Sequence, residues 1–458
     1  MRAYIIVDLG FGDSGKGLLT DFLVRHLGAD VVVRYNGGAQ AGHNVVAPDG
    51  RHHTFAQFGS GTFIPSVRTY LSRHVVIHPS ALLVEGDCLQ AQGIPDAFSR
   101  LRLSDQALVI TPFHQAANRI REIGRGAHRH GSCGVGVGEA VEDALAHPAD
   151  RVLAGDLLQP ETLRRKLRSI REWKREQIAA LCRENPPSAP LAREYEIFER
   201  EEVIDTWIAS IARIGALGLV VSDSVLECWL RETETVIFEG AQGILLDADA
   251  GFHPFTTWSR CTAANAFDLI RELAPEAQVC RLGVLRCYAV RHGPGPLPTE
   301  TDGLTSIISE HNHSGDWQGP VRYGWFDPVL ARYALEVTGG VDFFALTHLD
   351  VLSHLETWNY GVGYKGASGF DNTLLELDLS DGVLRNFHTP RPLSLAQREQ
   401  LTQALSGVIP MLETCEADER RVVQKIEELI GQPVDIVSHG PSAGNVHVLN
   451  SIHAGINS

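Results

Sequence analysis

Short apolar runs separated by glycine-rich turns fill the first part of the chain. Residues 3–7 (AYIIV) form one such run directly before a glycine-rich loop, which predicts a buried strand. Residues 18–28 have helical periodicity and end at Gly28, a residue that commonly closes a helix. Residues 30–35 form a second apolar run. A strand, a helix and a strand within about 35 residues are typical of a βαβ unit in a parallel sheet.

Apolar runs of strand length recur along the rest of the chain. They are residues 68–72, 74–78, 107–111, 235–240, 279–290, 343–351 and 434–440. Because such runs alternate with helical segments, the pattern favours an α/β fold around a mostly parallel central sheet.

Three longer segments have a different pattern. Residues 157–218 are charged and amphipathic, with a break at 184–190 (ENPPSAP), and they predict a helical insertion into the α/β body. The charge runs in it, RRKLR and EREE, are interpreted as solvated helix faces. Residues 292–326 are rich in Gly, Pro, His, Ser and Trp and are expected to form a long functional loop. Residues 393–432 return to helical periodicity.

Composition narrows the class of protein. The chain has 458 residues, 44% of them hydrophobic, and a net charge of −16. It has no apolar run of about 18 residues, so no membrane-spanning helix is expected, and its N-terminus does not resemble a signal peptide. The acidic charge disfavours nucleic acid as a partner but permits a small phosphorylated ligand in a local site. The eight cysteines form no CxxC pair, which favours reduced thiols in a cytoplasmic protein.

A glycine-rich loop follows the first predicted strand. Residues 10–17 read GFGDSGKG and have the GxxxxGK spacing of a phosphate-binding loop. Glycines let backbone N–H groups approach phosphate oxygens, the helix N-terminus adds positive potential, and Lys16 adds a charge. Gly17 replaces the usual Ser or Thr ligand of magnesium, so Asp13 is the candidate for that role or for a catalytic base.

Several further segments narrow the identity of this loop. They are VVRYNGGAQAGHNVV (32–46), FEGAQGILLDADAGFHPFTT (238–257), GPGPLPTE (293–300), GWFDPVLARYAL (324–335), LTHLDVL (346–352) and SHGP (438–441). Together with GFGDSGKG they resemble the adenylosuccinate synthetase family, in the family's order and over nearly the whole chain. The resemblance implies a single α/β domain over residues 1–458, a homodimer and a GTP-dependent ligase. In that reaction GTP phosphorylates the 6-oxygen of IMP, and the amino group of aspartate displaces the phosphate.

The resemblance also assigns roles to individual residues. Asp13 matches the base that takes the proton from N1 of the purine, and His43 matches the acid that stabilises the transferring phosphoryl group. Gln242 matches the residue that contacts the 6-oxo region. Asp350 resembles the reader of the guanine N1 and N2 edge, although a structural turn aspartate stays open as the alternative. Mg²⁺ is expected to bind Asp13 and the backbone carbonyl of Gly42.

The remaining assignments follow the same motifs. Residues expected to contact GTP are Gly12, Ser14, Gly15, Lys16, Gly17, Gly42, Asn44, His348, Asp350, Ser438 and Gly440. Residues expected to contact the acceptor or the amine are Gln40, Ser132, Cys133, Leu246, Thr257, Thr299 and Arg322.

Departures from the family pattern concern the acceptor phosphate and the amine. Ser14 stands where the family has glutamate, Gln40 where it has asparagine, and Cys133 where it has a phosphate-binding threonine. The arginine that family members lend across the dimer has no clear counterpart near Arg151.

The largest departure lies in the amino-acid loop. Of the arginines that clamp aspartate in the family, residues 314–325 keep only Arg322, and Asp316 adds a negative charge. A dicarboxylate needs charge-assisted donors, and Arg260, Arg291 and His313 are the candidates to replace those lost.

Three hypotheses follow. The first is adenylosuccinate synthesis from IMP, aspartate and GTP. The second is a paralogous ligase that runs the same chemistry on another purine-like nucleotide or nucleoside, with a less acidic amine, or both. The third is a guanine-nucleotide-binding protein without ligase activity, and the retention of both Asp13 and His43 argues against it.

Two other features receive structural interpretations. The pairs His128 with His130 and His311 with His313 have no nearby carboxylate or cysteine at a suitable spacing, so structural zinc is not expected. Trp325 is interpreted as a packing residue rather than a base-stacking one.

Overall fold

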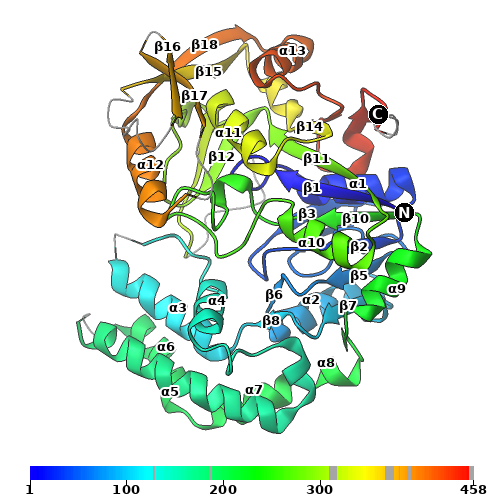
Figure 1. The fold of residues 1–458 in the computed structure, drawn as a ribbon, viewed down its shortest axis with the longest axis vertical. Coiled ribbons are helices and arrows are strands. Elements are labelled where there is room, and N and C mark those ends of the chain that lie inside the picture. Colours follow the sequence, from blue (N-terminus) through cyan, green and yellow to red (C-terminus); the bar gives the residue numbers. More distant parts are fainter. Residues whose placement is uncertain are drawn as a thin grey trace.

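A large, mostly parallel sheet forms the centre of the molecule (Figure 1). The computed structural model describes residues 1–126, 129–184, 188–308, 317–366, 376–380, 382–388 and 393–452. Within these residues the sheet has ten strands in the order β20 (Val446–Val448), β19 (Ile436–Ser438), β14 (Phe343–Thr347), β11 (Gln278–Arg286), β1 (Arg2–Asp8), β10 (Thr235–Glu239), β2 (Val31–Arg34), β5 (Arg68–Leu71), β7 (Leu101–Ser104) and β9 (Val220–Val221). All described pairs are parallel except β19 with β20. The predicted α/β class is confirmed.

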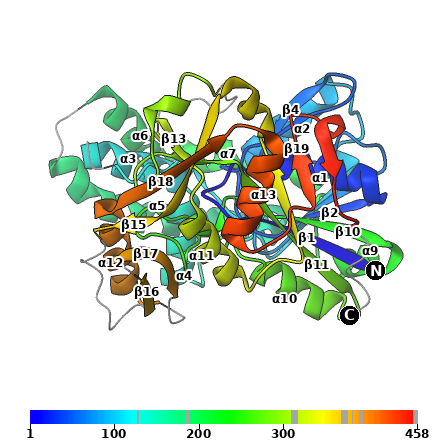
Figure 2. The same cartoon turned by 90° about the horizontal axis from the view of Figure 1, so that it is seen from above.

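Helices cover both faces of this sheet (Figure 2). Ile5 and Val7 of β1 pack in a core that includes α9 (Ser224–Glu232) and α10 (Ala264–Leu273), whereas Tyr4 and Ile6 pack with α1 (Lys16–Leu27). Because both faces are covered, the central strands are continuous apolar runs rather than alternating ones. The predicted strand, helix and strand at the N-terminus are confirmed, and Gly28 closes α1 in the left-handed conformation.

A block of helices lies beyond one end of the sheet, at the bottom of Figure 1. It comprises α3 (Pro112–Arg125), α4 (Val137–Ala146), α5 (Pro160–Glu184), α6 (Ala189–Glu199), α7 (Glu202–Ile211) and α8 (Arg213–Ala216). The helices predicted over 157–218 are therefore present. One residue of the RRKLR run departs from the solvated interpretation, because Lys166 is buried and donates to Asp156 at 2.7 Å.

A second sheet packs at the opposite end of the molecule, with strand order β16 (Glu376–Ser380), β17 (Val383–His388), β15 (Thr357–Lys365) and β18 (Ile409–Glu416). The prediction that residues 393–432 are helical is correct for α12 (Leu395–Gly407) and α13 (Glu419–Ile430) but wrong for β18 between them. β18 exposes Ile409 and Leu412 as well as polar residues, and it forms a strand by pairing with β15, a contact that no local periodicity reveals.

The segment 292–326 is also more ordered than predicted. The apolar run 279–290 divides at Cys287 into β11 and β12 (Tyr288–His292), and β12 pairs antiparallel with β13 (Val321–Trp325). A loop over the whole segment is thus wrong at both ends, because strand pairing with a distant partner outweighs its turn-rich composition. Residues 309–316, which include His311, His313 and Asp316, lie outside the described residues, as does His128.

Among the described residues, no helix has both the length and the apolar character needed to cross a bilayer.

Candidate active site

The candidate site lies at the carboxyl ends of the central strands. In a parallel sheet these ends share one edge, where ligands bind in open α/β folds. The phosphate loop follows β1, and its neighbours β10 and β11 lead into residues 240–246 and to Arg286. The segment with His43 follows β2, and the segment with Asp350 follows β14. Ser438 is the last residue of β19. Six consecutive strands of the sheet therefore bring together segments that are distant in sequence.

A carboxylate at the end of β1 organises the phosphate loop. Asp8 accepts hydrogen bonds from the backbone N–H groups of Gly10 and Ser14 at 2.9 and 3.0 Å and from the Ser14 hydroxyl at 2.9 Å. It also accepts one from Lys16 Nζ at 2.8 Å, and both side chains of this ion pair are buried. Lys16 thus has a carboxylate partner within its own loop. Sequence reasoning did not single out Asp8, although a carboxylate at the last position of the strand was a usable signal.

Glycine at position 17 has a steric reason. A Cβ there would lie 2.9 Å from the Cβ of His43 and 3.1 Å from the carbonyl oxygen of Asn44. The N-terminus of α1 therefore packs directly on β3 (His43–Val46), which forms a hairpin with β4 (His52–Phe55). The residue that removes the usual magnesium ligand is the one that allows His43 to approach the loop.

The loop after β10 packs against the phosphate loop. A Cβ on Gly243 would lie 2.2 Å from the carbonyl oxygen of Gly10, and Leu245 N donates to that oxygen at 3.1 Å. Gln242 has a left-handed backbone (φ 56°), and both polar atoms of its amide are buried without a hydrogen-bond partner. Because an unpaired buried amide is costly, Gln242 is prepared for a ligand that supplies the missing partners.

Asp13 is held from two sides. Its carboxylate Oδ2 lies 2.7 Å from Nε2 of His292, and its backbone carbonyl accepts from Arg286 Nε at 2.6 Å. Burial opposes ionisation of Asp13, but the hydrogen bond and charge of His292, together with Arg286 and Lys16, hold its pKa below the usual range. His292 and Arg286 belong to β12 and β11, and no local motif marked either of them.

His43 has a carboxylate behind it. Its Nδ1 lies 2.5 Å from Oε1 of Glu239, which also accepts from the backbone N–H of Ser60 at 3.0 Å and from the Ser60 hydroxyl. Burial opposes ionisation of Glu239, yet Arg34 and His43 lower its pKa to about 2. Burial and Arg34 lower the pKa of His43 against the opposing effect of Glu239. Glu239 therefore fixes the orientation of a neutral imidazole, as second carboxylates do for catalytic histidines.

The residues expected to read guanine lie at the ends of β14 and β19. Thr347 donates to the carbonyl of Ser14 at 2.9 Å, which ties this region to the phosphate loop. Asp350 is exposed in the first turn of η6 (Leu349–His354), and His348 before it has a left-handed backbone (φ 61°). Burial and Arg286 lower the pKa of His348 well below its usual value. Ser438 is buried at the end of β19, and Gly440 follows it in the chain.

The residues expected to bind the acceptor phosphate come from several segments. Ser132 Oγ accepts from the amide of Asn118 at 3.0 Å, and burial raises the pKa of Cys133 to about 11, so its thiol stays protonated. The carbonyl of Leu246 accepts from the N–H of Thr257 at 2.8 Å. Gln40 has a buried carbonyl oxygen without a partner. None of these groups carries a positive charge.

The arginines expected near the amine are engaged with this chain. Arg322 donates to the carbonyls of Gly293 and Gly295 at 2.9 and 2.7 Å and pairs with Glu300 at 2.7 Å. Arg291 is buried and donates to three carbonyls, those of Phe255, Pro294 and Pro296.

Two other expected residues near the amine also have internal partners. Arg260 pairs with Asp249 at 3.2 Å. Thr299 is buried, and its hydroxyl donates to the carbonyl of Trp325 at 2.6 Å.

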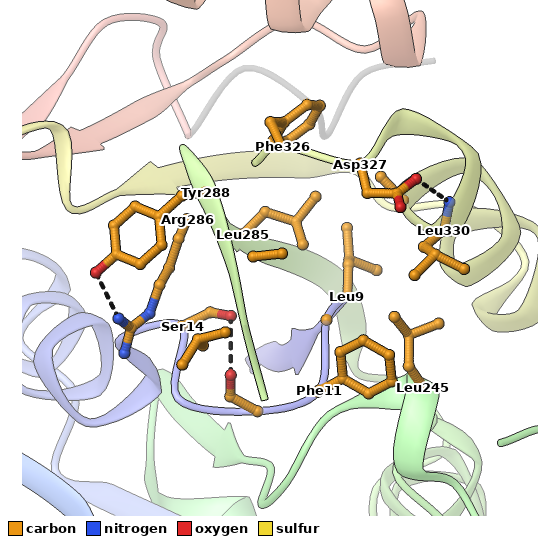
Figure 3. Close-up of a pocket in the computed structure, with 15 residues that line it drawn as sticks. Leu9, Phe11, Ser14, Leu245, Leu285, Arg286, Tyr288, Phe326, Asp327 and Leu330 are labelled. Atoms are coloured by element: carbon orange, nitrogen blue, oxygen red, sulfur yellow. Dashed lines mark hydrogen bonds between the residues drawn. The ribbon is translucent and has the colours of Figure 1, made fainter. Parts of the chain in front are cut away.

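A small, mostly apolar cavity lies beside the phosphate loop and is lined in part by residues of that loop. Figure 3 shows Leu9, Phe11, Leu245 and Leu330 around it, with Asp327 at the start of α11 (Pro328–Thr338). Its mostly apolar walls suit a nucleotide phosphate poorly.

Comparison with known proteins agrees with this architecture. The family model for adenylosuccinate synthetase matches residues 5–447. The adenylosuccinate synthetases of Neisseria meningitidis serogroup C (strain 053442) and Mycobacterium leprae (strain TN) are each 33% identical to this chain. The first alignment spans 449 residues, 97% of this chain and 98% of the relative, and the second spans 456 residues and 96% of each.

Solved structures share the fold. The fully ligated adenylosuccinate synthetase of Plasmodium falciparum has a TM-score of 0.76 and 21% identity over 98% of this chain and all of that one. The succinoaminodeoxyadenylate synthetase of cyanophage S-2L, bound to dGMP and dATP, has a TM-score of 0.57 and 19% identity over 98% and 96%. The chain therefore belongs to the adenylosuccinate synthetase family and is a GTP-dependent ligase that forms a carbon–nitrogen bond.

Proposed function

We propose that this ligase transfers the γ-phosphoryl group of GTP to the 6-oxo group of a purine nucleotide and then joins an amine at that carbon. The observation that carries the proposal is the arrangement of Asp13, His43 and Gln242 around one phosphate loop. Gln242 packs its backbone against Gly12, and His43 packs against Gly17. Each group comes from a different strand end, and each has a polar partner that orients it or lacks a partner that a ligand would supply.

The first step requires a stronger nucleophile at the 6-oxygen. Asp13 accepts the proton from N1 of the ring, which places negative charge on that oxygen. The unpaired amide of Gln242 binds the oxygen and fixes its direction. His43 uses Nε2 to hydrogen-bond the transferring phosphoryl group, while Glu239 holds Nδ1. The approaching phosphate charge favours the protonated imidazole and offsets the effect of burial.

Nucleotide binding uses the loop and the adjacent strand ends. The backbone of Gly12, Ser14 and Gly15 and the side chain of Lys16 bind the phosphates of GTP. Lys16 then shares its charge between the phosphates and Asp8. Asp350, with Ser438 and Gly440 beside it, reads the guanine edge.

Magnesium suits the oxygen groups beside the loop. The described residues contain no group of three or more His, Cys, Asp or Glu side chains that would hold a metal. Mg²⁺ takes few protein ligands at such sites and fills its sphere with phosphate oxygens and water. The carboxylate of Asp13 and the carbonyl of Gly42 would hold it, and the ion would neutralise charge on the phosphates. We also propose a homodimer, which light scattering of the purified protein tests.

IMP and aspartate are the first candidates for acceptor and amine, because the relatives are named for that synthesis. A second candidate donor, a less acidic amine, is favoured by one observation. Each of the three guanidinium nitrogens of Arg322 donates to an oxygen of this chain, and buried Arg291 donates to three backbone carbonyls. A dicarboxylate would have to displace these contacts or find other cations.

A matrix of acceptors and amines tests the proposal. Phosphate release from GTP is measured with IMP, dGMP and inosine, each combined with aspartate, asparagine, glycine or ammonia. Release that requires one acceptor and one amine together supports the ligase. The highest kcat/KM with IMP and aspartate would establish the first pair and reject the less acidic donor. GTP binding without turnover in every combination would overturn the proposal in favour of a nucleotide-binding protein.

A further inference from the structure

We propose that Arg286 is a positioning residue of the reaction, which holds the main chain of Asp13 in the left-handed conformation that directs its carboxylate at the purine. Tyr288 fixes the guanidinium group in turn. This inference rests on the ligase reaction proposed above, in which Asp13 is the base. It assigns a role to a buried arginine of β11 that lies more than 270 residues from Asp13 in sequence.

The backbone of Asp13 is unusual for a residue that has a side chain. Its φ is 58°, in the left-handed region, and among the described residues the other non-glycine residues with positive φ are Ser66, Gln242 and His348. This conformation costs free energy in a residue that has a Cβ, and it persists where surrounding contacts hold it. Three of the four residues belong to the candidate site. The direction of the Asp13 carboxylate therefore depends on a contact that maintains this backbone.

Arg286 supplies such a contact. Its Nε donates to the carbonyl oxygen of Asp13 at 2.6 Å, and its side chain is buried. Its Nη1 donates to the hydroxyl oxygen of Tyr288 at 2.6 Å, as Figure 3 shows, and the guanidinium carbon lies 5.2 Å from the centre of the same ring. One guanidinium group thus binds the loop and a neighbouring side chain, and its planar shape fixes the directions of both hydrogen bonds.

The next carbonyl of the phosphate loop is held from the adjacent strand. Thr347 of β14 donates to the carbonyl oxygen of Ser14 at 2.9 Å, and Thr347 is the register partner of Arg286 in the parallel sheet. Consecutive carbonyls of the loop therefore bind paired positions of two neighbouring strands. Because each oxygen has its own donor, removal of Arg286 releases the peptide after Asp13 while the peptide after Ser14 stays held. We therefore expect the base to be disturbed more than the binding of GTP.

Two substitutions weaken the hold on Asp13 to different extents. Arg286→Lys keeps the positive charge but lacks the fork of donors, so it cannot bind Asp13 and Tyr288 in the same way. Tyr288→Phe keeps the ring and removes the hydroxyl group that fixes Arg286. The first reaction step is measured as ¹⁸O positional exchange in GTP, with acceptor present and amine absent. Binding of GTP is measured by calorimetry.

We expect exchange to fall while the affinity for GTP is kept. Arg286→Lys should lower the exchange rate about ten- to a hundredfold, the value of a hydrogen bond from a charged donor, and should leave the Kd for GTP within about threefold of the wild type. Tyr288→Phe should lower the exchange rate by a smaller factor, about threefold, because Arg286 itself remains.

Arg281→Lys is the matched control. Arg281 lies on the same strand, and its Nη1 also donates to a backbone carbonyl, that of Gly339 at 2.8 Å, but it lies toward the opposite end of β11 from Arg286. This variant should exchange at the wild-type rate. The unfolding midpoint of every variant checks that it is folded, and if Arg286→Lys does not fold, Tyr288→Phe undergoes the same tests.

A double variant separates positioning of the base from a general effect on the loop. In Asp13→Asn the base is already lost, so the addition of Arg286→Lys should lower exchange little further. If Arg286 instead supported the whole loop, the two losses would multiply, as they do for independent effects.

Each outcome decides for or against the inference. Exchange at the wild-type rate in Arg286→Lys, or in Tyr288→Phe where only that variant folds, would overturn it. Losses that multiply in the double variant would also overturn it, as would an affinity for GTP that falls as much as exchange does. Exchange that is absent in the wild type with every acceptor would instead overturn the proposed function, and the inference with it.

Discussion

Three acidic side chains near the phosphate loop perform three different tasks. Asp8 neutralises Lys16, Asp13 is aligned by His292, and Glu239 orients His43. All three are carboxylates in a largely buried region, and their partners decide their roles. The substitution of each therefore has its own signature.

Replacing the proposed base separates chemistry from binding. Asp13→Asn keeps the shape of the side chain but cannot accept the N1 proton. We expect ¹⁸O exchange in GTP to fall about 10²–10⁴-fold, the usual contribution of a general base, while calorimetry finds a GTP Kd within a few-fold of the wild type. Exchange at the wild-type rate would show that Asp13 is not the base.

Removing the partner of Lys16 tests the internal ion pair. Asp8→Ala leaves a buried ammonium without its counter-ion, which should cost on the order of 3 kcal/mol of unfolding free energy. Saturation with a non-hydrolysable GTP analogue should recover part of that loss, because phosphates then neutralise Lys16. Urea unfolding with and without the analogue checks both effects. Asp49→Ala, which removes an exposed partner of Arg51, should change much less.

A site residue could be predicted from the sequence when it lies within a contiguous motif. Asp13, Lys16 and Gln242 sit in contiguous glycine-rich motifs, so spacing and family resemblance marked them. His292 and Arg286 act on Asp13 from strands more than 270 residues away in sequence. Sequence has no local signal for such contacts, because they are created by the pairing order of the sheet.

Among the elements, the pair of loops after β1 and β10 sets the shape of the site. The two strands are hydrogen-bonded neighbours with a register that runs from Arg2 with Thr235 to Ile6 with Glu239. Their loops consequently leave the sheet side by side and touch through backbone atoms at Gly10 and Gly243. The distance between the proposed phosphate and purine subsites is thereby set by main-chain packing.

A methyl group at this contact should displace one loop. Gly243→Ala would place a Cβ 2.2 Å from the Gly10 carbonyl and 2.3 Å from the Gly12 amide. We expect GTP affinity to fall at least about tenfold and the unfolding midpoint to drop, since overpacking costs about 1–3 kcal/mol. Gly407→Ala, at the end of α12 with open space around it, should retain both values. Wild-type GTP affinity in Gly243→Ala would contradict the close approach.

The start of α11 should carry a pH dependence. Asp327 accepts from Tyr364 and from two backbone N–H groups, and burial raises its pKa from 3.8 to about 6. The protonated Asp327 stabilises the folded state, and this contribution is fully present at pH values below 3.8, the ordinary pKa. It is lost as pH rises through about 6, the pKa in the folded state. Asp327→Asn should therefore gain stability relative to the wild type over that interval, on the order of 2 kcal/mol. Unfolding at a series of pH values measures the difference, and a constant difference would refute the shift.

Element prediction succeeded where packing is local. The strand before the phosphate loop was predicted from its apolar run, and α1 was predicted from its helical periodicity and the glycine that ends it. β13 and β18 did not, because each is a strand only through a distant partner, β12 and β15 respectively. Strand pairing supplies hydrogen bonds to the backbone N–H and C=O groups, and this outweighs a turn-rich or helix-like composition.

At the scale of the whole molecule, a buried charge cluster joins two helices of the helical block. Lys174 of α5 is fully buried between Glu139 and Asp143 of α4, with a distance of 2.8 Å to Asp143. α4 begins a few residues after Ser132 and Cys133. The position of these two residues therefore depends on how α4 packs against α5.

Loss of this lysine should be felt in both stability and acceptor binding. Lys174→Met removes the buried ammonium between the two carboxylates but leaves Arg121 2.8 Å from Glu139, so it should cost about 3 kcal/mol. KM for the acceptor should rise, because Ser132 and Cys133 lie just before α4. KM for GTP should change little, because none of the residues expected to contact GTP belongs to the helical block. Arg175→Met, which breaks an exposed pair with Glu199, is the neighbouring control. Equal stability of the two variants would contradict the coupling.

The division between the central sheet and the β12–β13 hairpin has an evolutionary consequence. The groups proposed to activate the nucleotide lie at strand ends whose positions are fixed by the core. The hairpin forms a separate two-stranded sheet, and it contacts Asp13 directly through His292 and indirectly through Tyr288 and Arg286. Mutations can accumulate in the hairpin, and new donors can be recruited by selection, while the ancestral phosphoryl transfer persists. The lineage can thus diversify its products without reinventing its chemistry.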